Sequence, residues 1–383
     1  MASLPSLLLI TRNLPPLRGG MERLNAHMAE ALAVDYRVTV IAPRGSFVGD
    51  DKRVRMLRCP VPGLVAFLAW AFVAGVFRAL VDRPRWVLGG SGLVAPMVLL
   101  AGWICGASRA VYLHGLDIVV PNGLYQRVWL PAIRKMHRCI VNSHNTRDLA
   151  VNAGVAADRV SIVFPGVTLP EKPPEADPER FRELRNLGTG PIILSVGRLT
   201  RRKGLAEFVE RALATLIAAA PDAQLVVIGD DAPDALNASG MGQRERIEAA
   251  ARKAGAQSAI HLLGAVPEDE LDAAFAAAAV HVFPGIDVPG DVEGFGMVAI
   301  EAAARGLSTV AFAVGGVGDA VEDPASGTLV PAERYELLVE ALVKRIKQDG
   351  NDVRDSCHRF AARFAWPVFD RAIRAALTKD GRA

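Results

Sequence analysis

Cysteine is scarce in this sequence, and its positions follow no metal-binding pattern. The chain has 383 residues and four cysteines, none of them in a C-x-x-C pair. Paired cysteines at short spacing are typical of zinc sites, and dense cysteines are typical of secreted disulfide-rich domains. The spacing therefore predicts no zinc site, and it favours a protein of a reducing, cytosolic compartment.

The sequence also lacks an excess of charge of one sign. Its formal net charge is +3 and its pI is about 8.7, with no long run of Lys or Arg. Because nucleic-acid-binding proteins gather basic residues on one face, we expect no nucleic-acid partner. No G-x-G-x-x-G motif follows the first apolar run, which argues against an NAD-dependent dehydrogenase.

Long hydrophobic runs are few. The N-terminal "MASLPSLLLITRN" is too short and too weakly basic for a signal peptide, so we expect residues 7–11 to form a buried strand. Residues 63–80, "GLVAFLAWAFVAGVFRAL", are nearly uncharged but only just long enough to span a membrane. We expect a core helix of an α/β domain here. The alternative is a helix lying on a bilayer surface beside Arg78, Arg83 and Arg85.

Short apolar runs alternate with helical patterns along the whole chain, which predicts parallel sheets of the α/β class. Expected strands lie at 6–11, 37–43, 86–90, 110–115, 138–143 and 160–166, and then at 191–198, 224–230, 259–266, 280–285, 308–316 and 327–331. The Pro-rich, acidic stretch 165–181 separates the two sets and indicates a domain boundary. We expect two Rossmann-like domains that face each other across a cleft.

The stretch "DVEGFGMVAIEAAARG", residues 291–306, places two glutamates around the start of an Ala-rich helix. A strand, a glycine turn and a helix N-terminus together favour an anion, because the first N–H groups are unpaired. Glu293 and Glu301 cannot favour the anion themselves, so we expect them to accept hydrogen bonds from sugar or ribose hydroxyls. The predicted ligand is a sugar nucleotide.

This E-x7-E pattern resembles that of the retaining glycosyltransferases of family 4 (group 1), which have the two-domain GT-B fold. "ILSVGRLTRRKGLAEFVERAL", residues 193–213, is similar to the family's stretch after the first strand of the second domain. The resemblance implies that Arg198 and Lys203 bind the diphosphate, as a guanidinium and an ammonium are suited to do. Arg201 and Arg202 are expected to be surface residues.

The resemblance extends to the N-terminal half. Gly19 and Gly20 resemble the family's glycine-rich loop, and "YLHGLDI" matches its H-x-x-D stretch with His114 and Asp117. The implied catalytic set is His114, Arg198, Lys203 and Glu293. The implied donor-binding set is Gly19, Gly20, Arg198, Lys203, Glu293, Gly294, Phe295, Gly296, Met297 and Glu301, and the implied acceptor-binding set is Asp117, Ser143 and Arg147.

The implied activity is transfer of a hexosyl unit with retention of anomeric configuration, with no cofactor and no metal. The resemblance also places the C-terminal helix on the first domain, which gives an acceptor-binding domain of 1–168 plus 361–383 and a donor-binding domain of 169–360. We expect a nucleotide-sugar donor and a lipid-linked or cell-envelope glycan acceptor of the lipopolysaccharide, exopolysaccharide or phosphoinositide type. The protein would then be cytoplasmic, with an anionic membrane surface as partner. A soluble acceptor and a nucleotide-sugar epimerase on the same fold remain alternatives.

Overall fold

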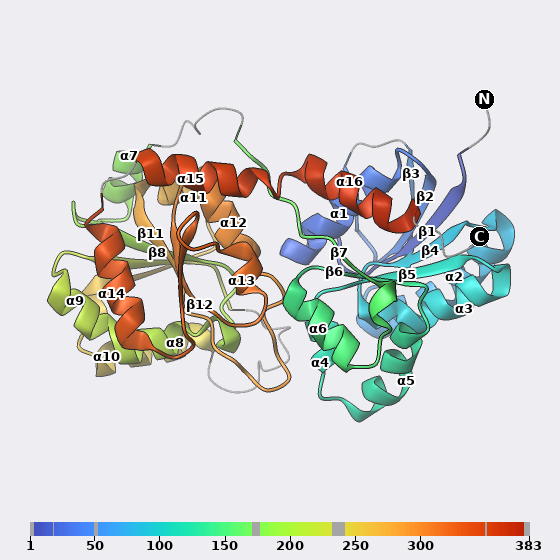
Figure 1. Cartoon of the computed structure of the whole chain (residues 1–383), viewed down its shortest axis with the longest axis horizontal. Helices are drawn as coiled ribbons and strands as arrows, with labels where there is room; N and C mark the ends of the chain where they lie inside the picture. The colour runs from blue at the N-terminus through green and yellow to red at the C-terminus, as the bar shows by residue number, and fades with distance from the viewer. Residues whose placement is uncertain are drawn as a thin grey trace. The chain divides into compact units, whose positions relative to one another are not determined.

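The chain folds into two α/β units in the computed structural model, which describes residues 4–17, 19–49, 53–170, 177–231, 242–348 and 351–378. The first unit comprises Met1–Gly166 and Trp366–Ala383, and the second comprises Val167–Ala365 (Figure 1). The chain thus divides at 166 and 366, where the sequence placed boundaries at 168 and 361. A parallel bridge explains the difference, because Val167 pairs with Ala365 and its N–H donates to the carbonyl of Phe364 at 2.8 Å.

The first unit contains a seven-stranded, wholly parallel sheet in the order β3-β2-β1-β4-β5-β6-β7. Its strands are β1 (Ser6–Ile10), β2 (Arg37–Ala42), β3 (Val54–Arg58), β4 (Trp86–Gly89), β5 (Ser108–Leu113), β6 (Arg138–Val141) and β7 (Val160–Ile162). The prediction of a parallel sheet is confirmed. β3 was not predicted, because this edge strand has no buried residue and so lacks a continuous apolar run.

Helices cover both faces of this sheet. They are α1 (Gly20–Leu32), α2 (Leu64–Asp82), α3 (Ala95–Cys105), α4 (Leu116–Val119), α5 (Gly123–Arg134), α6 (His144–Asn152) and α16 (Trp366–Thr378), with 3₁₀ turns η1 (Gly92–Val94) and η2 (Ala157–Arg159). Because side chains alternate along a strand, Leu7 and Leu9 pack with α1 and α16, whereas Leu8 and Ile10 pack with α2 and α3. The C-terminal helix α16 therefore completes the first unit.

Helix α2 is apolar on every side but packs along one face only. It is long and apolar enough to span a membrane by length and composition, and only 28% of its apolar window is buried. Phe67 and Ala71 are buried, whereas Val65, Val73 and Phe77 are 81%, 63% and 59% exposed. The expectation of a core helix therefore describes one face of α2, and the other face is an exposed apolar surface.

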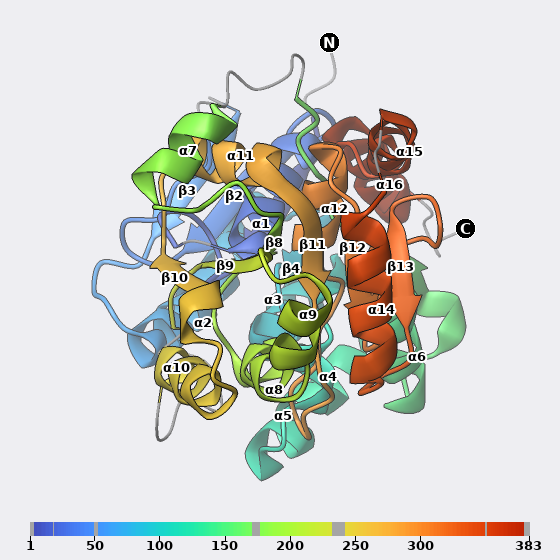
Figure 2. The ribbon, with the colours of Figure 1, turned by 90° about the vertical axis from the view of Figure 1, so that its left-hand side faces the viewer.

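The second unit contains a six-stranded parallel sheet in the order β10-β9-β8-β11-β12-β13 (Figure 2). Its strands are β8 (Ile192–Val196), β9 (Gln224–Ile228), β10 (Ile260–Gly264), β11 (Ala278–Phe283), β12 (Thr309–Phe312) and β13 (Gly327–Val330). Its helical elements are α7 (Pro178–Leu184), η3 (Arg201–Lys203), α8 (Leu205–Phe208), η4 (Val209–Leu213), α9 (Ala214–Ala219), α10 (Gln243–Lys253), η5 (Gln257–Ala259), α11 (Glu268–Ala277), α12 (Met297–Ala304), α13 (Val317–Ala320), α14 (Tyr335–Ile346) and α15 (Asn351–Ala362). α7, α11, α12 and α15 lie over one face, and α8, α9, α10 and α14 over the other (Figures 1 and 2).

The strand order reverses direction once in each sheet, and this predicts where ligands bind. In the first unit the reversal lies between β1 and β4, and in the second it lies between β8 and β11. Open parallel sheets bind ligands beyond the carboxyl ends of the two strands at such a point. We therefore expect ligands to bind at the loops that follow β1, β4, β8 and β11.

Candidate active site

The basic turn that follows β8 is held against the loop that follows β11. Gly204, at the end of the turn η3, has a φ of +66°, and a Cβ there would lie 2.0 Å from the carbonyl oxygen of Pro284. Only glycine fits such a position. The N–H of Ile286 also donates to the carbonyl of Arg202 at 2.9 Å. These contacts bring the basic residues of η3 beside the acidic residues of the β11 loop.

Lys203 and Glu293 form the centre of this arrangement. The ammonium Nζ of Lys203 lies 2.9 Å from Oε2 of Glu293 and 4.3 Å from the centroid of the Phe283 ring. Arg202 reaches the same carboxylate oxygen through Nε at 3.3 Å, and its Nη1 lies 3.8 Å from Asp291. The expectation that Arg202 is a surface residue is therefore wrong. Arg202 is held in the cluster by Asp291 and Glu293, which lie far from it in the sequence.

Burial and ion pairing act against each other on the two central residues. Burial raises the pKa of Glu293, but Lys203 and Arg202 outweigh it and lower that pKa from 4.5 to about 2. Burial lowers the pKa of Lys203, and Glu293 only partly opposes this. Glu293 contacts two cations, which favour its charged form. The pair is therefore ionised, and its net stabilisation is smaller than the carboxylate shift alone would give.

The backbone around Glu293 is fixed by a glycine pair on the neighbouring loop. The N–H of Gly316 donates to the carbonyl of Glu293 at 2.8 Å. A Cβ on Gly315 would lie 2.5 Å from that carbonyl oxygen, and one on Gly316 would lie 2.0 Å from the carbonyl oxygen of Gly294. The approach of the two loops thus depends on glycine, and it determines where the Glu293 carboxylate lies.

Helix α12 begins directly after this loop. Gly296 is its N-cap with a φ of +91° and provides no capping side chain, and Met297 is its first residue. The side chain of Phe295 is 2% exposed and packs on Phe364 with ring centroids 5.7 Å apart, and its part in donor binding stays a prediction. Its side chain anchors the loop in the core of the second unit. Glu301 lies one turn into α12 and acts electrostatically on Lys203.

Arg198, the other predicted diphosphate ligand, is exposed at the carboxyl end of β8. It precedes the turn that carries Lys203, so both cations belong to the same sheet edge. The structure thus brings Arg198, Lys203, Glu293 and Glu301 to one edge of the second unit. It adds Arg202 and Asp291, which sequence patterns alone do not distinguish from ordinary loop residues.

In the first unit, Gly19 and Gly20 form the start of α1. Gly19 is the N-cap without a capping side chain, and the carboxylate of Glu22 bends back so that Oε2 would lie 2.4 Å from a Cβ on Gly19. The other carboxylate oxygen of Glu22, Oε1, accepts a hydrogen bond from the side-chain amide of Asn13 at 2.9 Å. Glu22 was not predicted, because the N-cap is glycine and the Ser or Thr that begins a capping box is absent.

His114 lies between the ends of β4 and β5. Its Nε2 lies 3.0 Å from the carbonyl oxygen of Gly90, and its backbone N–H donates to Oδ2 of Asp117 at 2.9 Å. Burial raises the pKa of Asp117, while His114 acts in the opposite sense. A Cβ on Gly90 would meet Oδ1 of Asn25 at 2.2 Å, so the Gly90 backbone is tightly enclosed. Asp117, predicted as acceptor-binding, thus shapes the loop that holds His114.

Ser143 and Arg147 have other contacts. Ser143 is fully buried as the N-cap of α6, and its hydroxyl accepts a hydrogen bond from the N–H of Thr146 at 2.9 Å. Arg147 pairs with the adjacent Asp148 at 3.2 Å, and both side chains are largely exposed. The structure gives these two residues roles in capping α6 and at its surface, and their acceptor-binding role stays a prediction.

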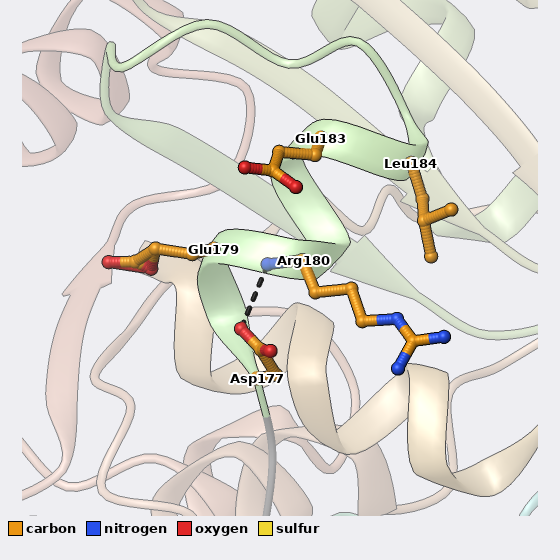
Figure 3. Close-up of a pocket in the computed structure, with 5 residues that line it drawn as sticks. All are labelled: Asp177, Glu179, Arg180, Glu183 and Leu184. Atoms are coloured by element: carbon orange, nitrogen blue, oxygen red, sulfur yellow. Dashed lines mark hydrogen bonds between the residues drawn. The ribbon is translucent and has the colours of Figure 1, made fainter.

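A surface hollow beside α7 lies apart from these groups (Figure 3). It is lined by residues of this one helix and its N-cap, Asp177, which accepts a hydrogen bond from the N–H of Arg180 at 2.9 Å. Within the described ranges, no group of three or more His, Cys, Asp or Glu side chains is placed to hold a metal ion.

Two family models match the chain in succession. Residues 18–170 match the model described as Glycosyltransferase Family 4, and residues 177–363 match the model described as Glycosyl transferases group 1. The first match covers most of the first unit, and the second begins at Asp177 and ends two residues before the end of the second unit.

Two curated relatives differ in how much of the chain they cover. The GDP-mannose-dependent alpha-(1-6)-phosphatidylinositol monomannoside mannosyltransferase of Mycolicibacterium smegmatis is 28% identical over 360 residues, which are 88% of each chain. The D-inositol 3-phosphate glycosyltransferase of Corynebacterium kroppenstedtii is 28% identical over 62% of this chain and 54% of its own length. The match to the second relative therefore spans about half of that protein.

Among solved structures, Anabaena HepE in complex with UDP superposes with a TM-score of 0.75. The alignment covers 98% of this chain and 100% of HepE at 17% identity. At this identity the likeness concerns the fold, and it extends over both units.

Proposed function

The chain belongs to the glycosyltransferases of group 1 and family 4 and has the GT-B fold, and on that premise we propose that it transfers a hexosyl unit from a nucleotide-diphosphate sugar to a lipid-linked or cell-envelope acceptor. The observation that carries the proposal is the cluster of Lys203, Arg202 and Glu293 beyond the ends of β8 and β11. It combines cations suited to a diphosphate with a carboxylate suited to sugar hydroxyls.

The donor would bind in the second unit. Arg198 and Lys203 supply the positive charge that a diphosphate requires, and the N-terminus of α12 offers backbone N–H groups beside them. Glu293 and Glu301 would accept hydrogen bonds from hydroxyls of the sugar and the ribose. The named relative uses GDP-mannose and the solved structure holds UDP, so both nucleotides are donors to test.

Transfer with retention of anomeric configuration is proposed because the family resemblance implies it, and transfer without a metal is proposed because Lys203 and Arg198 can supply the positive charge. Glu293 shares one carboxylate oxygen with two cations, which makes it a poor nucleophile for a covalent intermediate. We therefore favour a route in which the departing diphosphate oxygen takes the proton of the acceptor hydroxyl. Lys203 and Arg198 would stabilise the negative charge that develops as the bond to the sugar breaks, which is the part a metal ion has in other transferases.

The acceptor is proposed to be lipid-linked, with the enzyme on the inner face of the cytoplasmic membrane. Two observations support this. The relative that matches along most of both chains is named for a phosphatidylinositol mannoside acceptor. The first unit also exposes an apolar surface along α2, extended by Trp103 of α3, which is 73% exposed. Such a surface on a unit with a complete core favours contact with a bilayer.

The proposal is tested by incubating the protein with UDP- and GDP-sugars, with and without a membrane lipid extract, in the presence of EDTA. We expect nucleoside diphosphate release that requires the extract and survives EDTA, and NMR of the product should show the anomeric configuration of the donor. An inverted product would contradict retention, and activity lost in EDTA and restored by a divalent ion would contradict metal independence. A donor sugar that is altered without any acceptor would identify an epimerase instead.

A further inference from the structure

One carboxylate oxygen of Glu293 already contacts Lys203, which is one of the two cations proposed to bind the diphosphate. Oε2 of Glu293 is 2.9 Å from Nζ of Lys203 and 3.3 Å from Nε of Arg202. The Phe283 ring, 4.3 Å from Nζ, covers another side of the ammonium. An anion that approaches Lys203 therefore meets a negative charge bound to the same ammonium.

This negative charge is present throughout the physiological pH range. Lys203 and Arg202 overcome the effect of burial and hold the pKa of Glu293 at about 2. At physiological pH the Glu293 carboxylate therefore stays charged when a diphosphate approaches Lys203, and protonation cannot remove the repulsion between the two anions. It must be drawn to another partner, or the two anions must share the cations at a cost in free energy.

The backbone limits how the carboxylate can move. The carbonyl of Glu293 accepts the N–H of Gly316 at 2.8 Å, and the Gly315 backbone lies so close that a Cβ there would be 2.5 Å from the same oxygen. The Glu293 carboxylate can therefore leave Lys203 only by rotation about its side-chain torsions, while the backbone of the loop stays in place. A sugar hydroxyl near Lys203 would be within reach of the turned carboxylate.

We propose that Glu293 makes this site discriminate between sugar-linked and sugar-free diphosphates, because its carboxylate competes with the diphosphate for Lys203 unless sugar hydroxyls bind it. This inference rests on the proposed donor site. It gives Glu293 a specificity-determining role in addition to sugar binding. After transfer, the nucleoside diphosphate has lost its sugar, so the carboxylate returns to Lys203 and favours product release.

The test is isothermal titration of the full chain and of Glu293→Gln with UDP, GDP, UDP-glucose and GDP-mannose. For the nucleotide that the parent protein binds, Glu293→Gln should bind the free diphosphate about tenfold more tightly and its sugar ester about tenfold more weakly. Glu268→Gln is the matched control, because it removes the same charge from a side chain that is 76% exposed on α11. It should change neither affinity by more than about twofold.

A second variant separates this effect from a general disturbance of the site. With Lys203→Met in the background, Glu293→Gln should no longer strengthen binding of the free diphosphate, because the contested cation is absent. If Glu293→Gln binds the free diphosphate as tightly as the parent protein or more weakly, the inference is overturned. The proposed donor site is not contradicted by that result. A parent protein that binds neither the free diphosphates nor their sugar esters would overturn both.

Discussion

The exposed apolar face of α2 leads to a prediction about membrane binding. Val73 and Phe77 lie one turn apart on this face and are 63% and 59% exposed. Replacing both with serine leaves the buried face, including Phe67 and Ala71, unchanged. The double variant Val73→Ser/Phe77→Ser should therefore fold as the parent does but bind lipid vesicles less well.

The size of the effect follows from the exposed fractions. Full burial contributes about 1.5 kcal/mol for valine and about 3 kcal/mol for phenylalanine. Scaled by the fractions that remain to be buried, the two side chains contribute about 2–3 kcal/mol to vesicle binding. Because about 1.4 kcal/mol corresponds to a factor of ten, the double variant should bind about 30- to 100-fold more weakly.

The assay is co-sedimentation with phosphatidylcholine vesicles that contain phosphatidylinositol. The matched control is Val34→Ser/Leu184→Ser, which changes two side chains that are 45% and 66% exposed and belong to neither α2 nor α3. The control should sediment as the parent protein does. The reasoning is refuted if the parent does not sediment with vesicles, or if the α2 variant and the control lose binding equally.

Three further predictions concern the second unit. Because the pKa of Glu293 is lowered from 4.5 to about 2, its ion pairs stabilise the fold above pH 4.5 and lose that contribution as the pH falls towards 2. In urea unfolding, Glu293→Gln should be less stable than the parent by about 1–3 kcal/mol at pH 6 and by much less at pH 2; an equal loss at both pH values would count against the ion pairs. Gly204→Ala should raise the donor KM at least about tenfold, because its Cβ would lie 2.0 Å from the Pro284 carbonyl and displace Lys203; unchanged kinetics would show that the turn tolerates the shift. Glu301→Ala should mainly raise the donor KM and Arg198→Ala should mainly lower kcat, and the reverse pattern would exchange their ground-state and transition-state roles.

The alternation of apolar runs was enough to predict twelve of the thirteen strands that the described residues form, because central parallel strands are buried on both faces and need continuous apolar residues. The edge strand β3 was not predicted, since its side chains are at most partly buried and it therefore lacks a continuous apolar run. Burial of α2 could not be predicted for a related reason. An apolar helix has the same composition whether its second face meets a neighbouring element or solvent.

The candidate site was only partly predictable. Lys203 and Glu293 were expected to act on the same ligand, and the structure places them in direct contact. Their contact depends on Gly204, Gly315 and Gly316, whose importance is visible only when two distant loops meet. Arg202 has the same side chain as Arg201 in the sequence, and only the fold shows which of the two turns towards Glu293.

The central claim is that the Lys203 cluster holds the diphosphate of a nucleotide sugar during transfer. The most direct measurement is the rate of nucleoside diphosphate release from the active donor, compared between the parent protein and Lys203→Met at matched folding stability. We predict that kcat/KM falls at least about a hundredfold, because a charged group at the departing diphosphate is lost. A Lys203→Met variant that keeps the kcat/KM of the parent would contradict the account.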